Sequence, residues 1–236
     1  MERITAFQRA DVRVNEFVRS VYNWMCMGLA VTGLMAWYVS GNETLMGMVF
    51  GETGVKPLFF ILVIAELALV FSISGMVNKM SGATATALFI VYSGLNGVTL
   101  SFIFKIYSGS SIASTFFICS LTFLACSIYG WTTKKDLTSI GNFMFMGLIG
   151  IIIASVVNIF LKSPAINFII SYVGVIVFVG LTAYDTQKIK EMAVTQPAHL
   201  DGDVVRKGAI LGALRLYLDF INLFLMLLRI FGGSRD

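Results

Sequence analysis

Charged residues, histidine, cysteine and proline are all scarce in this sequence, and each shortage narrows the classes of protein that it can encode. Only 13% of the 236 residues are charged and 57% are hydrophobic, whereas about 25% of the residues in a soluble domain are charged. The mean hydropathy is +0.85. These values predict an integral membrane protein that contacts the lipid bilayer along most of its chain.

The shortage of histidine and cysteine removes most catalytic and metal-binding chemistry. The single histidine, His199, lies in a polar stretch, so we expect no serine–histidine pair inside a membrane. Cys26, Cys119 and Cys126 lie in apolar segments without metal-ligand spacing, and we expect them to pack in the core. No basic stripe is interleaved with aromatic residues, which argues against nucleic-acid binding. The sequence indicates neither an enzyme nor a resident cofactor.

Long apolar runs are abundant, and seven of them can cross about 30 Å of hydrocarbon. In lipid, such continuous runs must be helices because only helices satisfy their backbone groups internally. The runs are approximately Val21–Val39, Pro57–Gly75, Thr84–Phe104, Ile112–Trp131, Ile140–Leu161, Ala165–Gln187 and Gly208–Phe231. The predicted fold is therefore an all-α integral membrane protein, with a seven-helix transmembrane domain at 21–231 between a polar N-terminal tail at 1–20 and a short tail at 232–236.

The few prolines and the many glycines fit this division. Pro57 and Pro164 stand at predicted helix starts, where a missing N–H costs little, and Pro197 lies in a predicted loop. Glycines recur within the spans, and we expect them to allow close contact between helices in lipid. They include Gly28, Gly33, Gly94, Gly97, Gly147 and Gly150.

The basic residues predict the orientation in the membrane. If the N-terminus is inside, eleven lysines and arginines lie in the inner segments and four in the outer segments. This bias places the N-terminus in the cytoplasm and, with seven spans, the C-terminus on the opposite side. The long charged stretch 188–207 is then expected to be a solvated cytoplasmic loop.

The last span carries a polar seam. Arg215, Asp219 and Asn222 share one helix face because they are spaced by four and three residues. A carboxylate inside the bilayer costs roughly 2.5 kcal/mol or more, so Asp219 must face protein or water. A helix with such a seam is best placed at the centre of the bundle. Alternatively, Arg215 neutralises Asp219 within the helix, or extends its charge to the cytoplasmic interface.

A second carboxylate, Asp185, lies near the cytoplasmic end of the sixth span. Asp185 and Asp219 can meet if the sixth helix extends past Gln187 and the seventh begins near Leu211. Two carboxylates at about 4 Å repel each other by roughly 4 kcal/mol at an effective dielectric constant near 20. We therefore expect the pair to titrate as a unit and to share a proton near neutral pH. This is the behaviour required of a pH sensor on an ion path.

A third acidic residue, Glu66, lies in the middle of the second span. It is either a neutral carboxyl group that is hydrogen-bonded to a partner such as Asn96 or Asn158, or a further cation ligand on the same path. Replacing Glu66 with Gln and measuring cation flux separates the two interpretations.

The segments around both aspartates resemble the paired signature of the Bax inhibitor family, the transmembrane Bax-inhibitor-motif proteins. The matching segments are Thr182–Gln187 and Leu216–Phe224, and the seven-span layout covers essentially the whole chain. The resemblance implies seven helices with the last one central. It also implies a calcium leak that is gated by protonation of an aspartate pair, which corresponds to Asp185 and Asp219. Some bacterial relatives bind and restrain a membrane-anchored AAA protease.

One position departs from the family pattern. Relatives often carry an arginine near the cytoplasmic end of the second helix, where it latches onto the aspartates. This sequence has Met76 where that arginine is expected. Lys79 and Arg215 are the cations that can replace it.

Two functional hypotheses follow. The first is a pH-sensitive cation leak channel, with Asp185 and Asp219 as sensor and as oxygen ligands for calcium, supported by the amide oxygen of Asn222. The sequence does not separate calcium from protons or other cations. The second is a regulatory membrane protein without transport activity that binds a membrane-anchored AAA protease through the arginine-rich tail and the 188–207 stretch. A bacterial inner membrane is the expected location.

Overall fold

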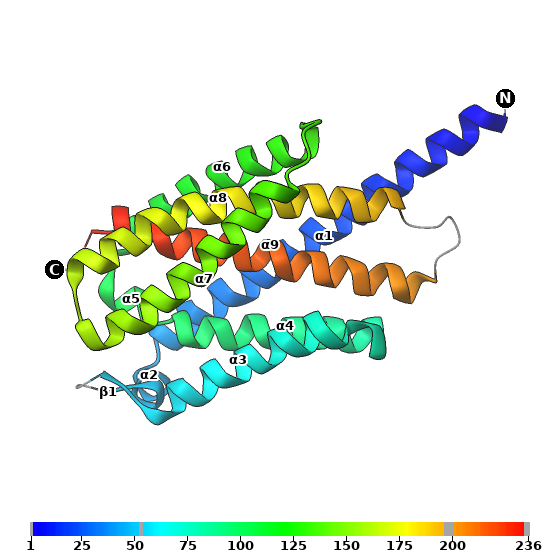
Figure 1. The fold of residues 1–236 in the computed structure, drawn as a ribbon. Coiled ribbons are helices and arrows are strands. Elements are labelled where there is room, and N and C mark those ends of the chain that lie inside the picture. The colour runs from blue at the N-terminus through cyan, green and yellow to red at the C-terminus, as the bar shows by residue number, and fades with distance from the viewer. Residues whose placement is uncertain (1, 52–53, 196–200, 234–236) are drawn as a thin grey trace. The chain divides into compact units, whose positions relative to one another are not determined.

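The computed structural model describes residues 2–51, 54–195 and 201–233, with side chains from residue 12 onward (Figure 1). Nearly all of this part of the chain is helical. In chain order the elements are α1 (Glu2–Ser40), α2 (Glu43–Val49), β1 (Phe50–Gly51), β2 (Gly54–Val55), α3 (Pro57–Met76), the 3-10 helix η1 (Val77–Lys79), α4 (Gly82–Leu100), α5 (Ile103–Ile106), α6 (Gly109–Thr132), α7 (Thr138–Leu161), α8 (Pro164–Thr195) and α9 (Gly202–Phe231).

Six described helical segments are individually long and apolar enough to cross a membrane. A seventh span results if α1 and α2, which meet at a bend of 102°, are counted together. The predicted all-α membrane fold is therefore confirmed. Pro57 and Pro164 begin α3 and α8, as predicted, whereas Pro197 and His199 lie outside the described residues.

Two segments that the sequence suggested to be tail or loop are helical. Helix α1 begins at Glu2, so the polar tail continues directly into the first span. Helix α8 continues to Thr195 and α9 already begins at Gly202, so the predicted loop 188–207 is wrong over most of its length. The charged residues there favour helix: Lys188 and Glu191 form an i,i+3 ion pair of 2.8 Å. The charged residues therefore do not mark the ends of these two helices.

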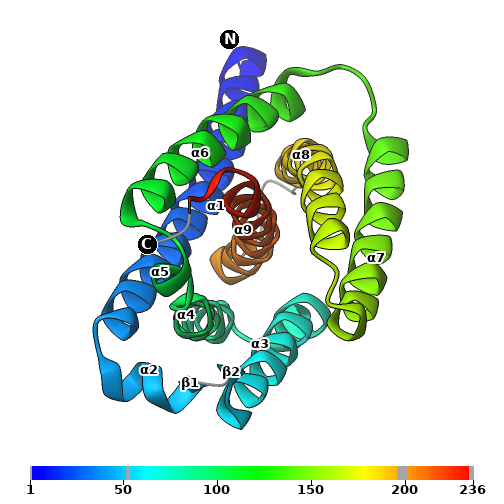
Figure 2. The same ribbon diagram turned by 90° about the vertical axis from the view of Figure 1, so that its left-hand side faces the viewer.

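The connection between α1 and α3 contains elements that the sequence did not predict. The side chain of Asn42 accepts a hydrogen bond of 3.1 Å from the backbone N–H of Leu45 and so caps α2. The short strands β1 and β2 pair antiparallel, with Phe50 opposite Val55. Figure 2 shows α2 and this hairpin beside the first turn of α3.

The chain forms two compact units. One contains Met1–Ile106 and Ala193–Tyr217, and the other contains Tyr107–Met192 and Leu218–Asp236. Helix α9 therefore contributes its first half to one unit and its second half to the other. In the first unit α1 and α3 each pack against α4. The single transmembrane domain stays a prediction.

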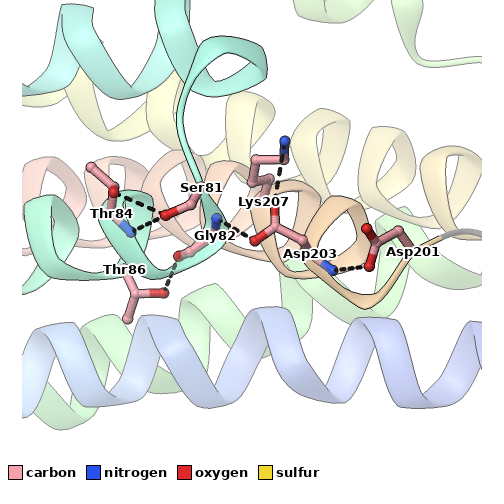
Figure 3. Close-up of polar contacts among 7 residues, drawn as sticks. All are labelled: Ser81, Gly82, Thr84, Thr86, Asp201, Asp203 and Lys207. Atoms are coloured by element: carbon pink, nitrogen blue, oxygen red, sulfur yellow. Dashed lines mark hydrogen bonds and ion pairs between the residues drawn. The ribbon is translucent and has the colours of Figure 1, made fainter.

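Asp203 attaches the start of α9 to the start of α4 in the first unit (Figure 3). Its Oδ1 accepts a hydrogen bond of 2.6 Å from the backbone N–H of Gly82, one of the amides that a helix N-terminus leaves unsatisfied. Its Oδ2 lies 3.4 Å from Nζ of Lys207. Arg206 adds a hydrogen bond of 3.0 Å from its Nε to Oγ1 of Thr86. The cytoplasmic end predicted for α9 is thus anchored by polar contacts.

The glycine prediction holds at three of six positions. A Cβ at Gly28, Gly97 or Gly147 would come within 3.0 Å of a side chain or the backbone of a neighbouring helix, whereas nothing lies within 4 Å of one at Gly33, Gly94 or Gly150. The cysteine prediction is also mixed, because Cys119 is buried but Cys26 is exposed. In lipid, a small or apolar side chain can face outward without cost, so residue type alone does not identify a helix contact.

Helix α9 is the most buried of the described spans. In an apolar stretch of 18 residues in α9, 72% of the residues are buried, compared with 39% or less in such a stretch of each of the other five single-helix spans. This burial is the property expected of the interior helix of the bundle.

Candidate functional site

Asp219 lies on the side of α9 that faces α8. Its side chain is buried, with 4% of its surface exposed. Met226 follows Asp219 by two turns and therefore lies on the same side of the helix. Met226 packs against Gly174 of α8 so closely that a Cβ at Gly174 would lie 2.8 Å from Cγ of Met226. The contact identifies the direction in which Asp219 points.

Asp185 lies on the corresponding side of α8. It follows Gly174 by three turns and shares its helix face, because 11 residues at 100° each return to within about 20° of the starting direction. Phe178 and Leu181, which lie on the same face between them, are buried. Asp185 and Asp219 therefore lie on the surfaces that α8 and α9 present to each other.

The heights of the two aspartates along the helices also correspond. Helices α8 and α9 run in opposite directions (Figure 1). Counted from the contact between Gly174 and Met226, the backbone of Asp185 lies about 16 Å along α8 and that of Asp219 about 10 Å along α9 in the same direction. Each Cβ leans toward the N-terminus of its own helix. In this antiparallel pair both side chains therefore lean into the interval of about 6 Å that separates their backbones.

The neighbours of Asp185 hold this turn of α8 against α6 and α7. The backbone carbonyl of Ala183 packs on Gly130 of α6, and the ring of Tyr184 packs on Gly141 of α7. The hydroxyl of Thr186 lies 3.5 Å from Oγ of Ser127 on α6. Within the motif Thr182–Gln187, these residues position the helix and direct Asp185 to the remaining side, where α9 packs.

Gln187 is an anchoring residue whose role the sequence did not reveal. Its Oε1 accepts a hydrogen bond of 2.8 Å from the backbone N–H of Leu137, and its Nε2 donates one of 2.8 Å to the carbonyl of Lys135. It thus fixes the connection between α6 and α7 two residues from Asp185. In that connection, hydrogen bonds from the side chain and backbone of Thr138 lower the pKa of Asp136. The only sequence feature that could have indicated this role is the position of Gln187 within the motif Thr182–Gln187.

Aromatic residues hold the other side of α9 against α6. The ring of Phe220 lies 5.5 Å from that of Phe116 and 5.4 Å from that of Phe123. Phe224 lies 6.3 Å from Phe116. These contacts follow Asp219 directly in the sequence, so α6 packs against both helices that carry the aspartates.

Arg215 and Asn222 lie on the least buried stripe of α9, and the buried Asp219 lies beside that stripe. Arg215, one turn before Asp219, is exposed, and Asn222 is half-buried. Nδ2 of Asn222 donates a hydrogen bond of 2.8 Å to the carbonyl of Leu218 on its own helix. This hydrogen bond uses the amide nitrogen, so Oδ1 of Asn222 can still accept a hydrogen bond or contact a cation.

Glu66 belongs to the first unit and has a partner that the sequence did not predict. Its Oε1 accepts a hydrogen bond of 2.9 Å from Oγ1 of Thr99 on α4. The suggested partners Asn96 and Asn158 have other contacts. Asn96 donates a hydrogen bond of 3.4 Å to the hydroxyl of Tyr92. Asn158 forms hydrogen bonds with the backbone of Ser163 in the turn after α7. Both suggested partners are therefore wrong. Only amide side chains were considered as partners, whereas the actual partner is a threonine on the facing helix.

The other suggested cation is also in the first unit. Lys79 lies in η1 and is exposed, as is Met76 at the end of α3. The roles suggested for Lys79 and Arg215 in place of the arginine latch stay predictions.

Comparisons with known proteins identify the family to which the chain belongs. A family profile described as "Inhibitor of apoptosis-promoting Bax1" matches residues 14–236. The chain is 52% identical over 220 residues to the inner membrane protein YbhL of Escherichia coli strain K12, which covers 93% of this chain and 92% of that protein. It is 46% identical over 222 residues to an uncharacterized protein of Borreliella burgdorferi, with 94% of each covered. It is also 45% identical over 226 residues to protein RP147 of Rickettsia prowazekii, with 96% and 93% covered. The chain therefore belongs to the Bax inhibitor family of multi-span membrane proteins.

Proposed function

We propose that this protein is a pH-sensitive cation leak channel of the bacterial inner membrane, and that Asp185 and Asp219 form its sensor. The observation that supports the proposal is the placement of both carboxylates on the facing surfaces of α8 and α9. A buried carboxylate in a membrane helix is expensive and is typical of ion paths and proton relays. The name of the Escherichia coli relative supports the inner membrane as the location.

A shared proton gives the pair two states. With one proton between them, the two carboxyl groups can hydrogen-bond and hold α8 against α9. Without it, two like charges about 4 Å apart repel by roughly 4 kcal/mol at an effective dielectric constant near 20. That difference is large enough to change the packing of two helices, so protonation is a physically sufficient signal for gating.

Calcium is the proposed cargo, because carboxylate and amide oxygens are the ligands that it prefers. Asp185, Asp219 and Oδ1 of Asn222 provide such oxygens on α8 and α9. In the part of the chain that is described, no cluster of three or more histidine, cysteine, aspartate or glutamate side chains can hold a metal ion. Calcium usually takes six to eight oxygens, so a site with so few protein ligands suits an ion in transit more than a permanently bound one.

Liposome flux tests the proposal. The purified full-length protein is reconstituted with a calcium indicator inside the vesicles, and calcium entry is compared with that of lipid-only vesicles. The proposal expects protein-dependent entry that changes on replacement of either aspartate by asparagine. Parallel measurements with sodium, potassium and protons determine the selectivity.

An absence of flux above the lipid-only background would contradict the channel. It would favour the alternative of a regulatory protein that binds a membrane-anchored AAA protease. Under that alternative, crosslinking in native membranes yields a specific partner, and removal of residues 1–20 abolishes the crosslink.

A further inference from the structure

A cavity of about 330 Å³ lies in the first unit. Its lining residues come from a part of the sequence that contains neither Asp185 nor Asp219. It is formed by the end of α2, the hairpin β1–β2, the first turn of α3 and the segment that includes α5. The described lining residues are Met46, Phe50, Gly51, Gly54, Val55, Phe59, Phe102, Lys105 and Ile106. Its volume is at the lower end of the range of about 300–1,000 Å³ that is typical of ligand pockets.

Three phenylalanine rings from separate elements form the apolar wall of the cavity. The ring of Phe50 lies 5.8 Å from that of Phe59 and 5.9 Å from that of Phe102. Met46 is held behind them, where Sδ accepts a hydrogen bond of 3.2 Å from Oγ of Ser101. The wall is therefore a packed structure that spans α2, β1, α3 and the turn after α4.

Lys105 is the one charged side chain among the described lining residues, and it is exposed. No ion pair joins it to a carboxylate in the described part of the chain. Lys56, next to the hairpin, is also exposed, and its side chain packs beside Gly51 while Nζ donates to the carbonyl of Gly47. An apolar cavity with the cation of Lys105 at its edge suits an amphiphile that carries one negative charge.

The predicted spans lead us to expect the cavity at the level where a phospholipid headgroup meets the hydrocarbon. Helix α3 begins at Pro57, just after the lining residues Gly54 and Val55, and the candidate span that contains α4 ends at Ile106. The cavity therefore lies at the ends of two spans. At that depth an acyl chain can reach the phenylalanine wall while its phosphate remains at the surface. Lysines near the surface attract anionic headgroups there.

From these observations we propose that the cavity binds one anionic phospholipid, with its phosphate on Lys105 and an acyl chain against Phe50, Phe59 and Phe102. The site is independent of the aspartate pair and of the proposed leak. It selects by charge at the rim and by apolar contact at the wall, so a zwitterionic lipid with the same chains is held less tightly.

Native mass spectrometry of the full-length protein tests the site with phosphatidylglycerol and phosphatidylcholine of identical chains. We expect a retained phosphatidylglycerol molecule that is favoured over phosphatidylcholine by about fivefold, the effect of one cation near an anionic surface. Lys105→Gln removes this preference and Lys105→Arg preserves it. Val55→Trp fills the cavity and lowers retention of both lipids.

Lys162→Gln is the matched control. Lys162 is also exposed and lies on the same predicted side of the membrane, but it does not line the cavity. Equal retention of the two lipids by the unmodified protein would overturn the proposal. So would a preference that Lys105→Gln leaves intact, or one that Lys162→Gln removes equally. Displacement of the lipid by an equal amount of free fatty acid would show that the cavity recognises a carboxylate and not a phosphate.

Discussion

Glu66 places a carboxyl group among the neutral polar side chains of α4. Its Oε1 accepts a hydrogen bond of 2.9 Å from Oγ1 of Thr99. Asn96 and Tyr92 lie on the same face of α4 as Thr99 and are hydrogen-bonded to each other. A half-buried carboxyl group that accepts a hydrogen bond from a neighbouring hydroxyl does not need a cation for its stability. The contact with Thr99 therefore supports a structural role for Glu66.

We expect Glu66→Gln to leave cation flux in liposomes unchanged, since an amide can keep the hydrogen bond to Thr99. Thr99→Val should lower the free energy of unfolding by about 1 kcal/mol, within the range measured for hydrogen bonds between membrane helices. Thermal unfolding in detergent measures this change. Thr122→Val is the control, because its hydroxyl bonds only to the carbonyl of Ile118 in its own helix. A loss of flux in Glu66→Gln would instead make Glu66 part of the ion path.

At the residue scale, the sequence revealed the unusual side chains but not their partners. Asp185, Asp219 and Glu66 could be identified because a carboxylate in an apolar run is expensive wherever it lies. Thr99 and Gln187 could not, because threonine and glutamine are common at the ends and faces of membrane helices. Their roles depend on which helix face meets which neighbour, and that information lies in the packing.

Helix α6 approaches α8 closely at Gly130. A Cβ there would overlap the backbone carbonyl of Ala183, which cannot rotate away as a side chain can. We therefore expect Gly130→Ala to lower the free energy of unfolding by about 1–3 kcal/mol, the usual cost of overpacking. Gly150→Ala on α7 is the matched substitution, because nothing lies within 4 Å of its Cβ. That variant should be neutral or more stable by about 0.5–1 kcal/mol, since alanine favours helix. Equal destabilisation of both variants would contradict the contact.

The contact of Asp203 with Gly82 attaches α9 to α4 (Figure 3). We expect Asp203→Ala to accelerate hydrogen exchange both at the start of α4 and in the first turns of α9, because both helix ends lose a partner. Asp201→Ala removes only the acceptor for the backbone N–H of Asp203. It should therefore affect α9 alone. Unchanged exchange around Gly82 in Asp203→Ala would show that this carboxylate does not hold the two helices together.

At the element scale, apolar run length predicted which segments cross the membrane but not where the helices end. The lipid requires about 20 apolar residues per span, while nothing requires the helix to stop at the surface. Helices α1, α8 and α9 all extend beyond their predicted spans through charged residues. Helix α8 continues past Gln187, as the meeting of Asp185 and Asp219 required, whereas α9 begins at Gly202, nine residues before the expected start at Leu211.

Helix α9 contributes residues to both compact units, and it is the most buried of the six described single-helix spans. Its first half carries Asp203 and Arg215, and its second half carries Asp219 and the phenylalanines that pack on α6. A change in the packing of α8 against the second half of α9 therefore acts on a helix that both units share.

The pH dependence of calcium flux tests the aspartate pair most directly. Flux into proteoliposomes is titrated across the neutral range for the unmodified protein, for Asp185→Asn, for Asp219→Asn and for the double variant. Asp136→Asn, which changes an exposed carboxylate outside the spans, is the control. The proposed pair predicts a pH-dependent step that the control retains and that either single variant abolishes, with no further effect in the double variant because the two groups titrate as a unit. A step that persists in the double variant, or two single effects that simply add, would contradict it.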